Sequence, residues 1–341
     1  MDDHKMRILN SSTSFAVRES GKVDSEMTIA AVVVTFNRKA LLAECLDALL
    51  QQTRPLDMIL VIDQASSDGT AEMLQQKGYR DLDQICYLRS EVNSGGAGGF
   101  HRGVESAFLG GFDWIWIMDD DAIAHPDALQ QMIQWTAEPG VAAIANSKIR
   151  LDGTLDEGHL ERTGARLQNG GPALLSFSSF VGLMIHRRVV EKIGFPKAEL
   201  FLQGDDTEYC RRLHRAGHIV FAEDAVLVHK EVRRPIATVQ RFGRPFTIYP
   251  TDQFCFHFYF LWRNRIWIET HDQGLRPARI FWLGRKMFRM LLRTCVIDRQ
   301  DLGLRIGILL KAFKDGLLGK FDNEFPFRMR ELSRRSERQR G

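Results

Sequence analysis

No cysteine pattern in the sequence would hold a structural metal or a disulfide framework. The five cysteines are scattered over 341 residues, and no two of them form a Cys-x-x-Cys pair. An odd number of dispersed cysteines argues against a structural zinc site and is typical of a reducing compartment. We therefore expect a cytoplasmic protein.

Long apolar runs are also absent. FYFLW and GILL are among the longest, whereas a membrane-spanning helix needs roughly 18 or more apolar residues. The opening stretch, MDDHKMRILNSSTSF, lacks the continuous apolar core of a secretory signal peptide. These absences predict neither a membrane span nor a signal peptide, and residues 1–27 are expected to form an irregular N-terminal arm.

The chain as a whole has no excess charge of one sign. It contains 46 Lys and Arg residues against 43 Asp and Glu residues, a formal net charge of +3. Such a balance predicts no nucleic-acid partner. The distribution is uneven, however, because residues 276–341 carry 17 basic and 7 acidic residues, a net +10, and residues 1–275 carry −7. An acidic body is thus joined to a basic C-terminal region.

What the sequence does contain is an alternation of apolar strands and helical patterns. Four apolar runs are each followed by a helical pattern: TIAAVVVTF (28–36), MILVID (58–63), ICYLR (85–89) and DWIWIM (113–118). Continuous β-branched runs are typical of strands buried on both faces of a parallel sheet. The pattern predicts an α/β fold with a doubly wound, mostly parallel sheet, whose ligands lie at the carboxyl ends of the strands.

The later part of the chain departs from this alternation. Two further strand patterns lie within residues 141–185, and FLQGDDTEYCRRLHRAG (201–217) is expected to form a loop that leads into a helix ended by Gly217. HIVFAEDAVLVHK is then expected to form a strand or a pair of strands that ends near His229. Beyond residue 235 the pattern is helical, aromatic and basic. We therefore expect an α/β domain over residues 28–235 and a mainly helical region over residues 236–341.

Polar residues or glycines follow each of the first four strands. These are TFNR (35–38), Asp63, NSGGAGGF (93–100) and the triplet Asp119–Asp121. Each has an ordinary structural explanation, since Asn37 can cap the first helix, Asp63 can sit in a turn, the glycines can form a flexible turn and the triplet a solvated acidic loop. Ser67 or Asp68 is the expected cap of the second helix. All four features at one sheet edge nevertheless predict a binding site.

The chemistry of these residues suits a metal and a diphosphate. A glycine-rich loop lets backbone N–H groups approach phosphate oxygens, and the following helix offers its positive end. Arg102, in that helix, could pair with a pyrophosphate. Asp119 and Asp121 offer hard oxygen ligands for Mg²⁺ or Mn²⁺, ions that also take phosphate oxygens from a substrate. A metal carrying a nucleotide diphosphate would then be the positive partner of the triplet.

Six motifs in this order and spacing resemble those of family 2 glycosyltransferases of the GT-A fold. They are TFNR, VIDQASSDGT, NSGGAGGF, WIWIMDDDA, GDDTEYCRRL and VLVHK, over about residues 28–265. The glycine run and the aspartate triplet look most like the galactofuranosyltransferase and rhamnosyltransferase branch of bacterial surface polysaccharide synthesis. Gln64 departs from the Asn or Asp that is frequent in the family. The Q-x-x-R-W signature of processive synthases is absent, which favours addition of a limited number of sugars.

The resemblance implies roles for individual residues. Asp119, Asp121 and His229 would hold Mg²⁺ or Mn²⁺, although a histidine at a strand end is also commonly structural. Asp206 would be the catalytic base, with Asp205 or Glu208 as alternatives. Asp63 would read the base edge of the nucleotide. The residues expected to contact the nucleotide-sugar donor are Thr35, Asn37, Arg38, Asp63, Asn93, Gly96, Arg102 and Asp120.

The implied function is a metal-dependent inverting transfer of a hexose. UDP-galactofuranose and dTDP-rhamnose are the donors that the resemblance suggests, with a lipid-linked or polysaccharide acceptor. Two alternatives are a non-catalytic scaffold that binds sugar nucleotides in a polysaccharide assembly complex and a sugar nucleotidyltransferase. The scaffold is disfavoured by the retained Asp206 and the complete triplet.

One C-terminal segment has the pattern of a basic amphipathic helix. On a helical wheel, ARIFWLGRKMFRMLL (278–292) places basic residues on one side and apolar residues on the other. Such a helix with a tryptophan predicts contact with a membrane surface that bears anionic lipid. The alternative is a helix docked on the rest of the protein with its charges in water. We expect peripheral attachment to the inner face of the cell membrane and no nucleic-acid binding.

Overall fold

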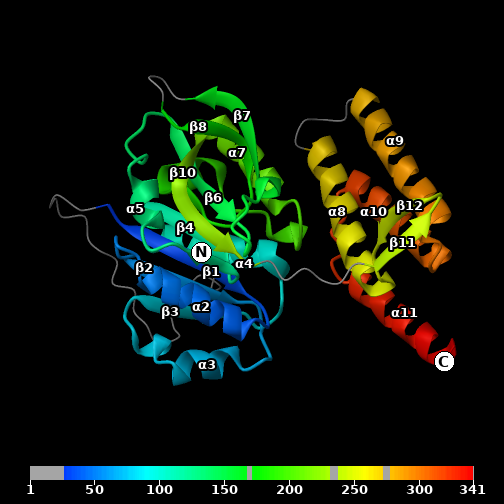
Figure 1. Cartoon of the computed structure of the whole chain (residues 1–341), viewed down its shortest axis with the longest axis horizontal. Coiled ribbons are helices and arrows are strands. Elements are labelled where there is room, and N and C mark those ends of the chain that lie inside the picture. Colours follow the sequence, from blue (N-terminus) through cyan, green and yellow to red (C-terminus); the bar gives the residue numbers. More distant parts are fainter. Residues whose placement is uncertain (1–26, 167–170, 231–236, 272–276, 341) are drawn as a thin grey trace, which may run out of the picture. The chain divides into compact units, whose positions relative to one another are not determined.

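The computed structural model describes residues 27–166, 171–230, 237–271 and 277–340, and the N-terminal arm expected over residues 1–27 lies outside them apart from Met27. The chain forms two compact units (Figure 1). Of the described residues, the first contains 27–93, 99–166, 171–196 and 209–230. The second contains 94–98, 197–208, 237–271 and 277–340.

A ten-stranded sheet organises the first unit, in the order β3-β2-β1-β4-β9-β6-β10-β8-β7, with β5 paired to β10. Strands β1, β2, β3 and β4 are mutually parallel where they pair, and β6 is parallel to β10. Strand β9 runs antiparallel to both β4 and β6. The strands are β1 Ile29–Thr35, β2 Met58–Asp63, β3 Ile85–Arg89, β4 Trp114–Asp119, β5 Ala122–Ala124, β6 Val141–Ile149, β7 Leu160–Arg166, β8 Ala173–Ser178, β9 Leu183–His186 and β10 His218–His229.

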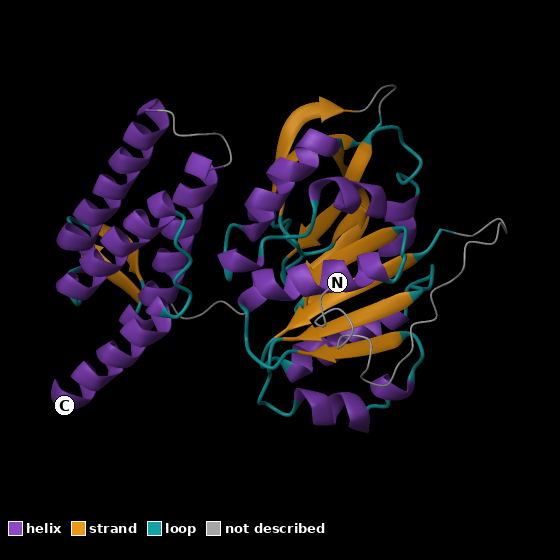
Figure 2. Cartoon of the chain, turned by 180° about the vertical axis from the view of Figure 1, so that it is seen from behind, coloured by secondary structure: helices purple, strands orange, loops and turns teal. Residues whose placement is uncertain are grey.

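Helices cover both faces of this sheet (Figure 2). Strand β1 shows why, because Ala31 and Val33 face the core beneath α2, and Val32 and Val34 face the core beneath α4. A strand buried on both faces needs apolar residues at consecutive positions. The helices and helical turns up to residue 216 are α2 Lys39–Leu50, α3 Thr70–Gln76, η1 Tyr79–Asp81, α4 Gly95–Leu109, α5 Ala128–Ile133, η2 Glu157–His159, α6 Arg187–Ile193, η4 Ala198–Leu200 and α7 Asp205–Ala216.

The prediction of a glycine-rich turn after β3 is wrong, because the glycines from Gly95 onward belong to α4. A Cβ on Gly99 would lie 2.4 Å from Cγ1 of Val34, and one on Gly103 would lie 2.2 Å from Cγ1 of Val32. Both distances are too short for carbon atoms in contact. The glycines at these two positions therefore let α4 lie directly against β1.

The expected helix caps also differ from those observed. Asn37 has a φ of 54° and precedes Arg38, the N-cap position of α2, whose side chain makes no capping hydrogen bond. The Oδ2 atom of Asp68 instead accepts from the backbone N–H of Lys39 at 3.0 Å. Its Oδ1 atom accepts from the N–H of Thr70 at 3.2 Å. Asp68 thus satisfies a donor at the start of α3, the helix it was expected to cap, although Gly69 occupies the N-cap position there. It also satisfies a donor at the start of α2, which the sequence did not suggest.

Helices dominate the second unit (Figure 1). They are α8 Thr251–His271, α9 Pro277–Arg293, η5 Thr294–Asp298, α10 Leu302–Leu318 and α11 Phe325–Arg340, with an additional hairpin of β11 Ala237–Arg241 and β12 Arg244–Ile248. Aromatic residues of α8 fill its core together with aliphatic residues of α9 and α10. No helix in the described part of the chain has the length and hydropathy needed to cross a membrane.

Candidate active site

Strand pairing brings the aspartate triplet to the end of β10. Asp119 is the last residue of β4, and the chain turns through Asp120 and Asp121 into β5. Strand β5 then runs antiparallel to β10, with Ala122 opposite His229. The imidazole Nε2 of His229 consequently lies 3.5 Å from Oδ1 of Asp121. Two of the three expected metal ligands are therefore neighbours in space although 108 positions separate them in the sequence.

Arg38 and Thr35 contact the middle of the triplet. The Thr35 hydroxyl donates to Oδ2 of Asp120 at 2.7 Å, and both residues are buried. Nη1 of Arg38 lies 3.3 Å from Oδ1 of Asp120 and 2.8 Å from Oδ2 of Asp121. Thr35, Arg38 and Asp120, all expected at the donor, thus lie together at the carboxyl ends of β1 and β4.

The three carboxylates have divergent pKa values. Desolvation and the charges of Asp121 and Asp120 raise the pKa of Asp119 to about 7. Burial raises the pKa of Asp120 to about 6 against the opposing effect of Arg38. Burial also tends to raise the pKa of Asp121, but His229 and Arg38 outweigh it and hold that pKa below its usual value. The site therefore cannot easily keep all its carboxylates charged, and a divalent cation would relieve this repulsion.

The atoms that would coordinate the metal fit such a cation. Oδ1 of Asp121 is buried and has no hydrogen bond of ordinary length within the described residues, and Nε2 of His229 lies 3.5 Å from it. Two ligand atoms bound to one ion at 2.0–2.2 Å are separated by roughly 3.0–3.6 Å. Carboxylate and imidazole together suit Mn²⁺ and related divalent ions.

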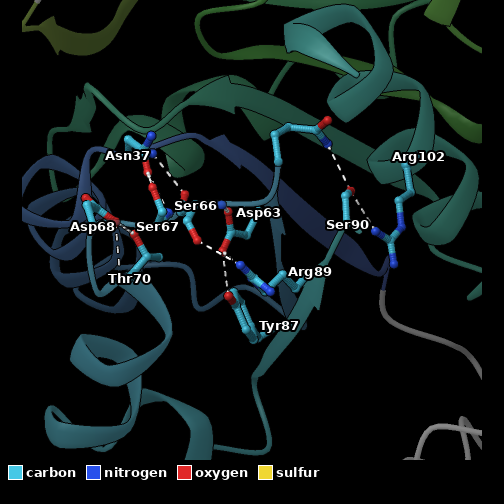
Figure 3. A network of polar contacts seen from close by, with 11 residues as sticks. Asn37, Asp63, Ser66, Ser67, Asp68, Thr70, Tyr87, Arg89, Ser90 and Arg102 are labelled. Atoms are coloured by element: carbon cyan, nitrogen blue, oxygen red, sulfur yellow. Dashed lines mark hydrogen bonds and ion pairs between the residues drawn. The ribbon is translucent and has the colours of Figure 1, made fainter. Parts of the chain in front are cut away.

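A second polar network occupies the ends of β2 and β3 (Figure 3). Asp63 is fully buried, and its Oδ1 accepts from the N–H of Ser66 at 2.8 Å. Its Oδ2 accepts from the hydroxyl of Tyr87 at 2.5 Å and lies 3.7 Å from Nε of Arg89. Burial, together with the hydrogen bond to Asp63 and the charge of that residue, raises the pKa of Tyr87 above its ordinary range. Asp63 therefore holds this loop in place, and its contact with a base stays a prediction.

Asn37 takes part in the same network. Its Oδ1 accepts from the N–H of Ser67 at 2.7 Å, and its own N–H donates to the hydroxyl of Ser66 at 2.9 Å. The loops after β1 and β2 are thereby joined side by side. The Arg102 guanidinium donates to the hydroxyl of Ser90 at 2.9 Å, next to this network in Figure 3.

Asn93, Gly96 and Asp206 are the remaining site residues expected from the sequence. Asn93 ends the first stretch of the first unit, and Gly96 lies in α4, where a Cβ would meet nothing within 4 Å. Asp206 belongs to the second unit, as the second residue of α7. Its Oδ1 accepts from the N–H of Thr207 at 2.6 Å. Asp206 is half-buried, whereas the alternative bases Asp205 and Glu208 are buried.

Comparison with known proteins identifies the family. The model of "Glycosyl transferase family 2" matches residues 30–194. Galactofuranosyltransferase GlfT1 of Mycolicibacterium smegmatis is 31% identical over 302 residues, which cover 83% of this chain and 95% of the relative. The chain belongs to glycosyltransferase family 2. The GlfT1 of Mycobacterium tuberculosis is 32% identical over 266 residues, covering 73% of this chain and 84% of that protein.

Further matches agree with the branch that the motifs suggested. O-antigen chain rhamnosyltransferase RfbN of Salmonella typhimurium is 26% identical over 123 residues, covering 36% of this family 2 chain and 38% of the relative. Among solved structures, S. aureus TarS 1-349 in complex with UDP-GlcNAc has a TM-score of 0.56 at 14% identity, covering 85% of this chain and 82% of that one. GalNAc-T7 with UDP, GalNAc and Mn²⁺ has a TM-score of 0.56 at 12% identity, covering 86% and 56%. The fold of the family 2 protein is therefore GT-A, as expected.

The sequence did not point to two residues that the structure places beside His229. Asp156 and His159 follow β6, and together with His229 they form a group whose potential ligand atoms all lie within 4.8 Å of one another. No motif or spacing marked them, because the contact arises from a loop that folds back onto β6, where Asp156 donates its N–H to the carbonyl of Lys148 at 2.7 Å.

Proposed function

We propose that this family 2 protein is a metal-dependent inverting glycosyltransferase that moves a hexose from a nucleotide-diphosphate sugar to a cell-surface glycan acceptor. The observation that carries the proposal is the 3.5 Å approach of Asp121 Oδ1 to His229 Nε2, beside two carboxyls with raised pKa values. Asp119, Asp121 and His229 would hold Mg²⁺ or Mn²⁺. Bound there, the ion would neutralise charge that develops on a departing diphosphate.

The donor would be held by residues at the ends of β1 to β4. Thr35 and Arg38 hold the two carboxylate oxygens of Asp120, the acid that we assign to the sugar. Arg102 offers a guanidinium for phosphate oxygens, with its position set by Ser90. Asn37 and Asp63 fix the two loops that we assign to the nucleoside, and Asn93 and Gly96 complete the expected donor set.

Asp206 is the proposed base. An inverting transfer needs one carboxylate to take the proton of the acceptor hydroxyl as its oxygen attacks the anomeric carbon. Asp206 stands in the first turn of α7, where backbone dipoles favour its charged form, and it is the least buried acid of its stretch. Asp205 and Glu208 are buried and thus poorly placed to meet an acceptor.

Galactofuranose is the hexose we propose first. The two galactofuranosyltransferases named above match 83% and 73% of this chain, whereas the rhamnosyltransferase matches 36% of it. UDP-galactofuranose is therefore the preferred donor and dTDP-rhamnose the second. We propose a lipid-linked or polysaccharide acceptor, reached by a cytoplasmic protein on the inner face of the cell membrane.

Helix α9 supplies the proposed membrane contact. It packs into the second unit through Leu283 and Met287, which are buried, and leaves Phe281 and Phe288 largely exposed. Arg285 lies between the two phenylalanines in sequence and is also exposed. Exposed aromatics interleaved with arginine favour an interface with anionic lipid.

The test is a panel of nucleotide sugars incubated with Mg²⁺ or Mn²⁺, with release of nucleoside diphosphate as the readout. Asp206→Asn should abolish transfer and leave donor binding intact, whereas Asp121→Ala should weaken metal-dependent donor binding. Asp224→Asn, which removes an exposed acid of β10, should change neither. Anomeric NMR signals of the product would establish inversion, and unchanged transfer by Asp206→Asn would refute the assigned base.

Two other activities would give different outcomes. A sugar nucleotidyltransferase would release pyrophosphate instead of a nucleoside diphosphate. A non-catalytic scaffold would bind UDP with Mn²⁺ and turn over no donor in the panel.

A further inference from the structure

We propose that Asp156 is a positioning residue that orients the imidazole of His229 toward the cation. The ring of His229 has carboxylates on both sides, with Nε2 lying 3.5 Å from Asp121 and Nδ1 lying 3.8 Å from Oδ2 of Asp156. A metal-bound histidine usually donates its other ring N–H to a carboxylate, a carbonyl or a water, which fixes its tautomer and direction. Asp156 has the chemistry and the location for that role.

Asp156 is itself held on two sides. Its Oδ1 accepts from the Arg150 guanidinium at 2.6 Å, and its Oδ2 lies 3.3 Å from Nε2 of His159. The other ring nitrogen of His159 lies 3.0 Å from the hydroxyl of Ser179. Asp156 is buried, so neither oxygen is free to turn into solvent. Its Oδ2 is thereby kept on the side of His229.

The separation of 3.8 Å between Nδ1 and Asp156 exceeds a hydrogen bond, which for N–H···O is about 2.7–3.2 Å. Binding of an ion by Nε2 would make the imidazole N–H more acidic and draw it toward the carboxylate. The proposal rests on the metal site of the proposed function and adds a residue that does not touch the ion. The same three side chains could instead bind an ion directly, which is the competing outcome.

The experiment measures binding of Mn²⁺ alone to the full-length protein by electron paramagnetic resonance and calorimetry. Asp156→Ala should weaken Mn²⁺ binding by about 10- to 100-fold, the usual loss when such a partner is removed. Asp152→Ala is the matched control, because Asp152 lies in the same loop and its exposed carboxylate accepts hydrogen bonds from nearby Thr154. It should leave the affinity unchanged. Asp121→Ala and His229→Ala should both abolish binding.

A second readout separates positioning from a merely structural effect. Nitrogen-15 NMR of the protein loaded with diamagnetic Mg²⁺ should show the His229 proton on Nδ1 with the chemical shift of a hydrogen bond to a carboxylate. Asp156→Ala should remove that shift while the amide spectrum stays that of a folded protein. Asp156→Glu, which retains a carboxylate, should restore part of the Mn²⁺ affinity. A His229 proton found on Nε2 in the Mg²⁺-loaded wild-type protein would overturn the proposal.

Each remaining outcome has one meaning. If Asp121→Ala abolishes Mn²⁺ binding and Asp156→Ala does not weaken it, Asp156 has no positioning role. If Asp121→Ala retains binding while the Asp156, His159 and His229 variants all lose it, the ion is bound by those three residues and our inference is wrong. If the wild-type protein binds no Mn²⁺, the metal of the proposed function fails instead.

Discussion

The guanidinium of Arg38 lies 2.8 Å from Oδ2 of Asp121 and so places a positive charge beside a proposed metal ligand. The same nitrogen lies 3.3 Å from Oδ1 of Asp120. Arg38 therefore partly neutralises the acidic triplet before any cation binds, and it would compete with that cation for Asp121.

Arg38→Met should consequently tighten the binding of Mn²⁺ alone. Removing one positive charge next to the ligand should favour the ion by at least about 1 kcal/mol, the interaction of two unit charges about 4 Å apart in bulk water, which is a several-fold gain in affinity. Calorimetry without nucleotide provides the measurement. Arg54→Met is the control, since Arg54 pairs with Asp57 at the opposite end of β2. Weaker binding by Arg38→Met would show that Arg38 organises the carboxylates rather than competing for them.

Asp68→Ala should destabilise the first unit. The carboxylate accepts from N–H groups at the starts of α2 and α3, and loss of such a cap costs about 0.5–2 kcal/mol. Urea unfolding followed by circular dichroism tests this. Asp83→Ala removes an exposed acid nearby in sequence and should be neutral. Equal stability of both variants would mean that water satisfies these donors equally well.

Arg305→Leu should strongly destabilise the second unit. Arg305 is fully buried, donates to the carbonyl of Tyr249 at 2.7 Å and lies 3.4 Å from Oδ2 of Asp298. Removing one partner of a buried pair costs about 3–5 kcal/mol, because the other charge stays buried. Chemical unfolding should show the loss, whereas Arg285→Leu, on the exposed face of α9, should have little effect. A double variant with Asp298→Ala should recover part of the stability.

His257 should make the second unit sensitive to acid. Burial lowers its pKa from 6.5, and Gln203 lies 2.8 Å from its Nδ1 while the Tyr249 ring stacks on it at 5.0 Å. Because the folded pKa lies below the unfolded one, the unfolded state takes up a proton first as the pH falls below about 6.5. The free energy of unfolding should then decrease toward lower pH, by at most about 1.4 kcal/mol per pH unit.

His257→Phe should flatten this dependence between pH 7 and pH 5 in urea titrations. The exposed His218 provides the comparison, and His218→Phe should keep the wild-type slope. A His257→Phe variant with an unaltered slope would assign the acid sensitivity to other groups.

The exposed face of α9 should bind anionic vesicles. Phe281 and Phe288 are 74% and 65% exposed, and each buried phenylalanine contributes about 2 kcal/mol. The double variant Phe281→Ser and Phe288→Ser should therefore lower the affinity for vesicles, measured by sedimentation, by more than about tenfold. Leu109→Ser removes an exposed leucine of α4 and should not. If the wild-type affinity for vesicles depended on neither the lipid charge nor the salt concentration, the proposed interface would be contradicted.

The sequence predicted the parallel half of the sheet closely. Strands β2 and β3 begin and end at the expected residues, because a short and mostly apolar run is favourable only where a strand is buried in the sheet. The β11–β12 hairpin was missed, since its residues are mostly exposed and show no clear alternation. Helix α9 was expected from its period of apolar residues and is observed.

The site was only partly predictable for a physical reason. Side chains at the ends of parallel strands converge by a general rule, so the grouping of Thr35, Asp63 and Asp119 could be foreseen. The approach of His229 depends on the short antiparallel pair β5–β10, and that of Asp156 on a loop. Contacts of this kind leave no periodic trace in a sequence.

The closeness of α4 to β1 limits how this enzyme could be altered. At Gly99 and Gly103 the helix backbone rests on Val34 and Val32 with no intervening side chains. Laboratory evolution that randomises α4 should therefore recover almost nothing but glycine at these two positions, while the more accessible Glu105 and Ser106 accept many residues. Helix α4, which carries Arg102, is therefore a poor target for redesign on the side that faces the sheet and a good target on the side that faces solvent.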